Sequence, residues 1–142
     1  MKQEVTTTVK LRLVLNESDR MAFSETTERY TAACNFVSEY VYDTRRCVFR
    51  QLHDTLYGTL RSEFGLKAQM AQSVIKTVIA KYRSVKSNGH KRMKVRFTLP
   101  QCDLVYGRDW SVVSDGLSVN TLGDRVHAGY FSEGNVFDCM FA

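Results

Sequence analysis

The chain begins with a segment in which apolar and polar side chains alternate. The residues expected on one side are Val5, Thr7, Val9, Leu11, Leu13 and Leu15, and those expected on the other are Thr6, Thr8, Lys10 and Arg12. A period of two that is rich in β-branched residues predicts a strand with one buried face. Residues 16–19 then offer turn and N-cap side chains, so we expect a long helix to begin there.

Apolar residues next recur at helical spacing in three stretches. The stripes are Tyr30, Ala33, Cys34, Val37 and Val41; then Val48, Leu52, Leu56, Leu60 and Phe64; then Ala71, Val74, Ile75, Val78, Ile79 and Tyr82. Gly65 is expected to end the second helix, because glycine readily adopts the left-handed conformation found after helix ends. Three amphipathic helices with short connections predict a small bundle.

Beyond Tyr82 the pattern becomes strand-like. Residues 84–94 are polar and basic, and the predicted strands that follow are 95–99, 110–113, 117–121 and 125–131, separated by Pro100 and by turns that contain glycine. The first strand needs pairing partners. We therefore expect it to join the later strands in one sheet or barrel, with the helices as an insertion, which makes the fold class α+β.

Composition and length describe an ordinary globular domain. The chain has 142 residues, 44% hydrophobic and 25% charged, which argues against intrinsic disorder. It lacks a membrane-length apolar run and an N-terminal signal sequence, so we expect a soluble cytoplasmic protein with no membrane partner. The four cysteines form no CxxC pair and the three histidines no HxxxH pair. Neither zinc nor disulfides are expected, and we interpret the cysteines as buried apolar residues.

Positive charge is concentrated in two places. Residues 81–96 contain seven cations and no acid, whereas 97–142 has two cations against six acids. A smaller cluster surrounds Phe49 and consists of Arg45, Arg46 and Arg50. Such a run can be a solvated linker, but its position between two structured parts favours contact with nucleic-acid phosphates.

Motifs for catalysis are missing. The sequence contains no Gly-rich phosphate loop, no GxSxG and no HExxH. The aspartates near predicted turns, which we expect to bond their own backbone, are Asp103, Asp109, Asp115 and Asp124. Four aromatic residues could stack on bases, although filling a small β core is the commoner role of such residues. They are Tyr106, Trp110, Tyr130 and Phe131.

Several segments resemble proteins of the TnpB type. Residues 30–38, YTAACNFVS, resemble a helix of that family with a Tyr, a small residue, an Asn and a Ser. Residues 52–66, LHDTLYGTLRSEFGL, with AQMAQ at 68–72, are similar to its LxxxxYxxLRxxFGLxAQMA stretch. Residues 117–126, LSVNTLGDRV, are similar to a strand pair of the family, although Asp124 interrupts the usual Gly-Arg. The resemblance extends over nearly all of residues 5–131, in the family's order.

TnpB-type proteins are transposon-encoded, RNA-guided DNA endonucleases related to the type V CRISPR effectors. The resemblance implies that residues 1–15 and 86–142 form a wedge domain, an OB-like antiparallel β-barrel, and that residues 16–85 form an inserted helical recognition lobe. The implied partners are a guide RNA and a target DNA that carries a short adjacent motif. Base pairing would read the sequence, while the protein recognises shape and charge.

The resemblance also implies a set of nucleic-acid-binding residues. Matching positions place Phe49, His53, Gln69 and Gln72 near the duplex of the adjacent motif, where a glutamine amide can pair with an adenine edge. The basic run 81–96 would follow a nucleic-acid backbone. The full candidate set is Arg45, Arg46, Phe49, Arg50, His53, Gln69, Gln72, Lys76, Arg83, Lys86, Lys91, Arg92, Lys94, Arg96 and Arg108.

The family's nuclease is a RuvC-like domain whose Asp, Glu and Asp hold metal ions, and none of these acids has a counterpart here. We expect no catalytic residue, cofactor or catalytic metal in these 142 residues. Three alternatives stay open. The chain could complete a nuclease with a RuvC-containing polypeptide, or be a protein-binding domain. It could also be a regulator that binds DNA without a guide, although no helix pair shows the short Gly-containing turn and the helix lengths of a helix-turn-helix.

Overall fold

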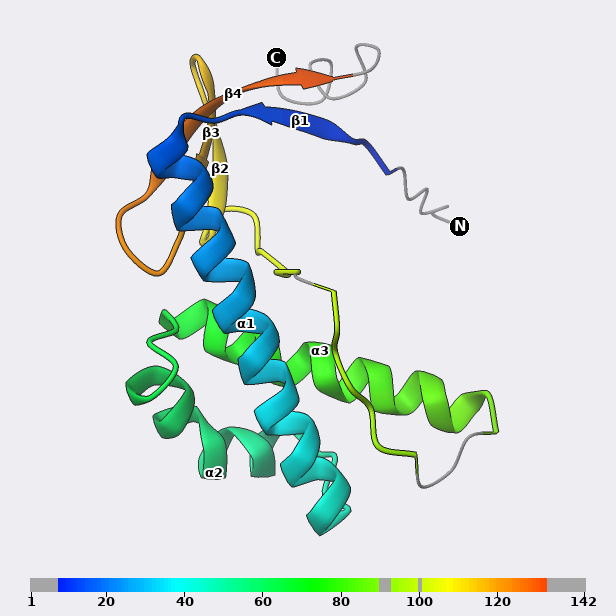
Figure 1. The fold of residues 1–142 in the computed structure, drawn as a ribbon. Helices are drawn as coiled ribbons and strands as arrows, with labels where there is room; N and C mark the ends of the chain where they lie inside the picture. Colours follow the sequence, from blue (N-terminus) through cyan, green and yellow to red (C-terminus); the bar gives the residue numbers. More distant parts are fainter. Residues whose placement is uncertain (1–7, 90–92, 100, 133–142) are drawn as a thin grey trace, which may run out of the picture.

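The computed structural model describes residues 8–89, 93–99 and 101–132 of the chain. Their elements are, in order, β1 (Leu11–Val14), α1 (Glu17–Thr44), α2 (Phe49–Ser62), α3 (Ala68–Ser87), β2 (Trp110–Val113), β3 (Gly116–Val119) and β4 (Val126–Ser132). Figure 1 shows α1 running from the sheet at one end toward α2 and α3 at the other. The predicted α+β class and the insertion of three helices after the first strand are confirmed.

The helix ends follow the predicted signals. The side chain of Asn16 caps α1 by accepting a hydrogen bond from the backbone N–H of Asp19 at 2.8 Å. Gly65, with φ of 65°, lies in the connection after α2, and the N–H of Leu66 donates to the carbonyl of Leu60 at 3.2 Å. Arg45 ends α1 in the left-handed conformation, with φ of 61°. A non-glycine residue there is unusual.

The three predicted apolar stripes form one core between the helices. α1 and α2 each pack on α3, and the side chains of Tyr30, Leu52 and Val78 are fully buried. Leu66 and Met70 add to this core from the α2–α3 connection and the first turn of α3. The second stripe extends beyond α2 at both ends: Val48 precedes the helix and is 54% exposed, whereas Phe64 follows the helix and still packs against the core.

The sheet is antiparallel, in the order β1-β4-β3-β2. β1 therefore pairs with the last strand of the chain, as predicted, with Leu13 opposite Tyr130. Within the described residues β1 and β2 form the two edges and no pairing joins them. The sheet is open, so closure into a barrel stays a prediction.

The segment predicted as a strand at 95–99 is not one. It runs in irregular conformation beside the helices, where side chains of α1 and α3 satisfy its backbone. The amide of Asn35 donates to the Phe97 carbonyl at 3.0 Å and accepts from the Phe97 N–H at 2.8 Å. Ser38 donates to the Val95 carbonyl, and the Val95 N–H donates to the Tyr82 hydroxyl at 3.3 Å. The prediction was wrong because these polar side chains replace the bonds of a strand partner.

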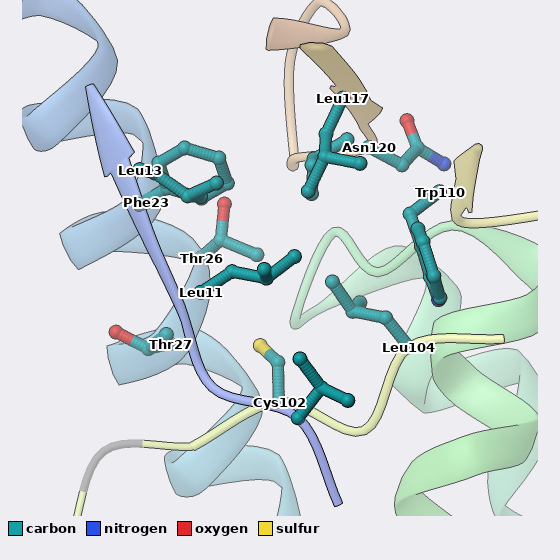
Figure 2. A pocket seen from close by; sticks show the side chains of 12 residues that line it. Leu11, Leu13, Phe23, Thr26, Thr27, Cys102, Leu104, Trp110, Leu117 and Asn120 are labelled. Atoms are coloured by element: carbon teal, nitrogen blue, oxygen red, sulfur yellow. The ribbon is translucent and has the colours of Figure 1, made fainter. Parts of the chain in front are cut away.

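An apolar pocket of about 540 Å³ lies between the inner face of the sheet and α1. Figure 2 shows Leu11 and Leu13 of β1 near Phe23 of α1, with Leu104 and Trp110 toward the other side of the space. The hydroxyl of Thr26, which also lines the pocket, is engaged with the backbone of Ala22. The pocket thus lies between β1 and the segment that leads into β2.

The cysteines lie in apolar surroundings, as expected for those that the structure describes. Cys34 is buried, and Cys47 and Cys102 are half-buried against the helical core. Burial, reinforced by the nearby Asp103 carboxylate, raises the pKa of both Cys34 and Cys102 to about 12. These two thiols are therefore protonated at neutral pH. Cys139 lies outside the described residues.

Candidate nucleic-acid interface

Four of the candidate residues share one face of α3. Gln69, Gln72, Lys76 and Arg83 are three, four and seven residues apart, which places them on one side of a helix. The buried residues Ala71, Val74 and Val78 lie on the opposite side. Helix α3 contains no Asp or Glu, so this face offers amides and cations with no acidic side chain between them.

A row of aromatic rings on α2 adjoins this face. Phe49, His53 and Tyr57 follow one another at four-residue spacing, with ring centroids 5.6 Å apart for the first pair and 4.4 Å for the second. His53 and Tyr57 stack at 19° between ring planes. The Nζ of Lys76 lies 5.5 Å from the Phe49 ring, within the range of a cation–π contact. The structure thus brings Phe49, His53 and Lys76 together, and it adds Tyr57, which the four-residue spacing could have identified.

The α1–α2 connection carries more positive charge toward the other end of α3. Arg45 and Arg46 are exposed there, and Arg50 is exposed in the first turn of α2. The guanidinium of Arg45 lies 4.7 Å from the centre of the Tyr42 ring. Burial raises the pKa of the Cys47 thiol in this connection, while the charges of Arg83 and Lys86 partly oppose that rise. The charges of Arg83 and Lys86 on α3 therefore lie close to the connection that carries Arg45 and Arg46.

The remaining candidates are dispersed. Lys94 forms an ion pair with Glu39 at 3.5 Å, so its charge is partly compensated, although both side chains are largely exposed. Arg96 is exposed in the segment that follows α3. Lys91 and Arg92 lie outside the described residues. The predicted continuous run thus consists of cations with different surroundings.

Arg108 lies at the junction between the helices and the sheet. Its guanidinium donates to the side-chain oxygen of Gln69 at 3.4 Å. Lys67, just before α3, donates to the Asn120 side chain at 2.7 Å and to the Gly123 carbonyl. These bonds tie the beginning of α3 to the loops of the sheet, and Lys67 was missed because its partners are 53 and 56 residues away.

The aspartates serve different purposes from one another. Asp109 is fully buried and accepts the Val105 N–H at 2.9 Å, as predicted for a turn aspartate, while its Oδ1 has no hydrogen-bond partner. Asp103 instead accepts from the Thr77 hydroxyl of α3 at 2.6 Å, so the prediction of a self-bonded turn is wrong there. Thr77 also bonds the Tyr30 hydroxyl at 2.9 Å, and burial raises the Tyr30 pKa above its ordinary value.

Nothing in the described part of the chain gathers three or more His, Cys, Asp or Glu residues in a way that could hold a metal ion. Over the same residues, no helix combines the length and apolarity that crossing a bilayer requires. The face formed by Phe49, His53 and Tyr57 on α2 and by Gln69, Gln72, Lys76 and Arg83 on α3 is hereafter the α2–α3 face. Six of its seven residues are candidates from the sequence, and Tyr57 is the addition.

The connection between α2 and α3 differs from the expectation for helix-turn-helix proteins. It consists of residues 63–67 and contains Gly65 in the left-handed conformation. The connection therefore contains a glycine, but it is longer than the roughly three to four residues of a helix-turn-helix, and it joins helices of 14 and 20 residues.

Comparison of the chain with protein-family models, with curated proteins and with solved structures finds no match.

Proposed function

We propose that the chain binds nucleic acid through the α2–α3 face, as the guide-RNA- and target-DNA-binding part of a TnpB-like RNA-guided system. The observation that carries the proposal is the approach of Lys76 to Phe49 at 5.5 Å. The resemblance singled out Phe49, His53, Gln69 and Gln72 from two separate stretches of sequence, and these stretches form adjoining helix faces. Such an arrangement supports one shared ligand surface.

The chemistry of the face suits a duplex that carries a short motif. Glutamine amides such as those of Gln69 and Gln72 can make paired hydrogen bonds to an adenine edge. Lys76 and Arg83 on the same face can contact phosphates, which fix the register of a protein on a duplex without reading its sequence. The lack of acidic residues in α3 favours the approach of a polyanion.

The wider proposal follows the resemblance. The sheet would close into the OB-like barrel of a wedge domain, and the protein would act in the cytoplasm with a guide RNA. Nuclease chemistry would come from a RuvC-containing polypeptide, since the family's metal-binding acids have no counterpart in the sequence. Guide and target would pair with each other, and the protein would supply shape and charge recognition.

The first test is whether the purified protein carries RNA. We expect an absorbance ratio typical of nucleic acid that falls after ribonuclease treatment, and sequencing of one discrete RNA encoded near the gene. Protein that is free of RNA, and that has no affinity for transcripts from its own locus, would contradict the guide-RNA part of the proposal.

Variants test the surface itself. Lys76→Glu should weaken binding of duplex DNA or guide RNA and reduce the slope of log affinity against log salt concentration by about one contact. Arg29→Glu is the matched control, because Arg29 is exposed on α1, a helix that contributes no residue to this face. Neutralising Lys91, Arg92 and Lys94 together should reduce the slope by roughly three contacts. If the slope is unchanged in Lys76→Glu and also in the variant with Lys91, Arg92 and Lys94 neutralised, these four residues do not contact the nucleic acid.

A second candidate function is DNA binding without a guide. The Gly65-containing connection between α2 and α3 favours it, because α3 would then present Gln69 and Gln72 in its first turns, where recognition helices read bases. Sequence-specific duplex binding by RNA-free protein would support this function over the guided one. Duplex binding that appears only after a guide RNA is added would exclude it.

A further inference from the structure

The sheet has a second surface, on the side away from α1 and the apolar pocket. Leu117 and Val119 of β3 belong to the inner core, so Ser118 between them points outward. Ser118 is opposite His127 in the register, and Arg12 of β1 is opposite Phe131. Alternation along the strands therefore defines an outer sheet face. Its exposed members are Lys10, Arg12, Val14, His127 and Phe131, while Gly129 is half-buried and Ser118 is buried.

Phe131 is the unusual member of this face. Its side chain is 69% exposed, whereas Trp110 and Tyr130 pack against the inner core of the sheet. A hollow of about 430 Å³ lies beside Phe131 and is also lined by Lys10, Leu11, Arg12 and Ser132. A large aromatic ring thus borders a depression that two cations also line.

The charge on the outer sheet face is positive. Lys10 and Arg12 lie at one end, and Arg125 extends its guanidinium toward Ser118, with Nε donating to the Ser118 hydroxyl at 2.9 Å. None of the strands β1, β2, β3 and β4 contains an Asp or Glu. An exposed ring among cations, on strands without acids, is complementary to unpaired nucleotides, which offer both a flat base and a phosphate.

We propose that the outer sheet face binds unpaired nucleotides of a single-stranded RNA, with one base stacked on Phe131 and the adjacent phosphates near Lys10 and Arg12. The choice of RNA as the strand rests on the proposed function, whereas the surface itself is separate from the α2–α3 face. A base inside a duplex cannot reach the ring, because both of its flat sides are already stacked. A protein partner would favour a broader apolar patch. Among the described strands, Val14 is the one other exposed large apolar side chain on this face, and Val113 is half-buried.

The test uses the full chain and a fluorescent oligouridine of about twelve nucleotides, a length suited to the site sizes of single-strand-binding folds. Phe131→Ala should weaken binding at least about fivefold, the lower end of the effect of losing one stacked base. Phe131→Tyr retains a ring and should restore binding. Met21→Ala, which removes another side chain that is 65% exposed, is the matched control and should bind like the parent.

Photocrosslinking identifies the contact directly. An oligouridine that contains 4-thiouridine should crosslink to the peptide carrying Phe131, and Arg12→Glu should reduce the yield. Phe131→Ala that binds like the parent, or crosslinks confined to α2 and α3, would overturn the inference. An equal loss with oligothymidine would support stacking on Phe131 but overturn the choice of RNA as the strand.

Lys76→Glu separates this inference from the proposed function. In one outcome, Lys76→Glu binds duplex DNA and guide RNA more weakly than the parent, and Phe131→Ala binds oligouridine as well as the parent does. This outcome excludes the outer sheet face as a binding site, and the proposed function stands. If Phe131→Ala loses oligouridine binding and no guide or duplex binds the parent protein, the proposed function fails and the outer sheet face remains a single-strand site.

Discussion

The helical part, α1 to α3, and the sheet part, β1 to β4, are stabilised in different ways. Among the described residues, fifteen buried apolar residues form the core of the helices, whereas the strands bury four, Leu117, Val119, Val126 and Ala128. The rest of the inner face is half-buried, and a pocket of about 540 Å³ lies against it. The helices are thus held by burial, and the sheet depends more on strand pairing and on tightly fitted turns.

The largest test of this difference is a charge placed in the helical core. Val78 is fully buried on α3, and Val78→Asp would bury a carboxylate without a partner. We expect a loss of more than about 4 kcal/mol, enough to unfold the helices. Thermal melting followed by far-UV circular dichroism measures it. Ala80→Asp, at an exposed position of the same helix, introduces the same charge and should melt near the parent.

The sheet can be disrupted at one backbone position. Gly116 begins β3 with φ of 156°, and a Cβ added there would lie 2.2 Å from the carbonyl oxygen of Ala128 in β4. Gly116→Ala should therefore cost roughly 2–5 kcal/mol through overpacking and backbone strain, and it should separate β3 from β4.

Hydrogen exchange shows whether the two parts are independent after that substitution. Faster exchange at Val119 and Ala128 with unchanged protection of Val74 and Val78 would support separate stabilisation of sheet and helices. Equal loss of protection in both parts would mean that helices and sheet unfold as one unit. The two parts would then differ in how their cores are packed but not in their stability.

A smaller effect is expected where the segment after α3 is held against α1. Asn35 makes two hydrogen bonds with the backbone of Phe97, and Asn35→Ala would leave both of these backbone groups unpaired. We expect a loss of about 1–3 kcal/mol in chemical denaturation. Glu28→Ala, at an exposed position of the same helix, should leave stability nearly unchanged. A similar small change in both variants would show that water replaces the Asn35 bonds.

The difference between the helical part and the sheet part also explains which features could be predicted from the sequence. The helices follow from local periodicity, and their core residues Tyr30, Leu52 and Val78 were identified by spacing alone. The strand at 95–99 was predicted wrongly because its apolar pattern does not reveal that Asn35 and Ser38, about 60 residues earlier, satisfy its backbone.

The candidate interface divides in a similar way. Gln69, Gln72 and Lys76 could be placed on one face of a helix from their spacing, and the resemblance selected the two glutamines. Their approach to Phe49 depends on how α2 packs on α3. The outer sheet face could not be derived from the sequence, because it depends on a register that pairs Arg12 with Phe131, 119 residues later.

The smallest predicted effect is a gain in the helical part. Gly58 lies within α2, and a Cβ added there meets no atom within 4 Å. Gly58→Ala should raise the free energy of unfolding by about 0.5–1 kcal/mol, because alanine loses less backbone entropy in a helix than glycine. Chemical denaturation measures the gain, and oligouridine binding should not change, since the outer sheet face lies elsewhere. If helix stability sets the stability of the whole chain, the sheet's hydrogen-exchange protection will rise by the same amount. If the sheet unfolds on its own, only the helices will gain hydrogen-exchange protection.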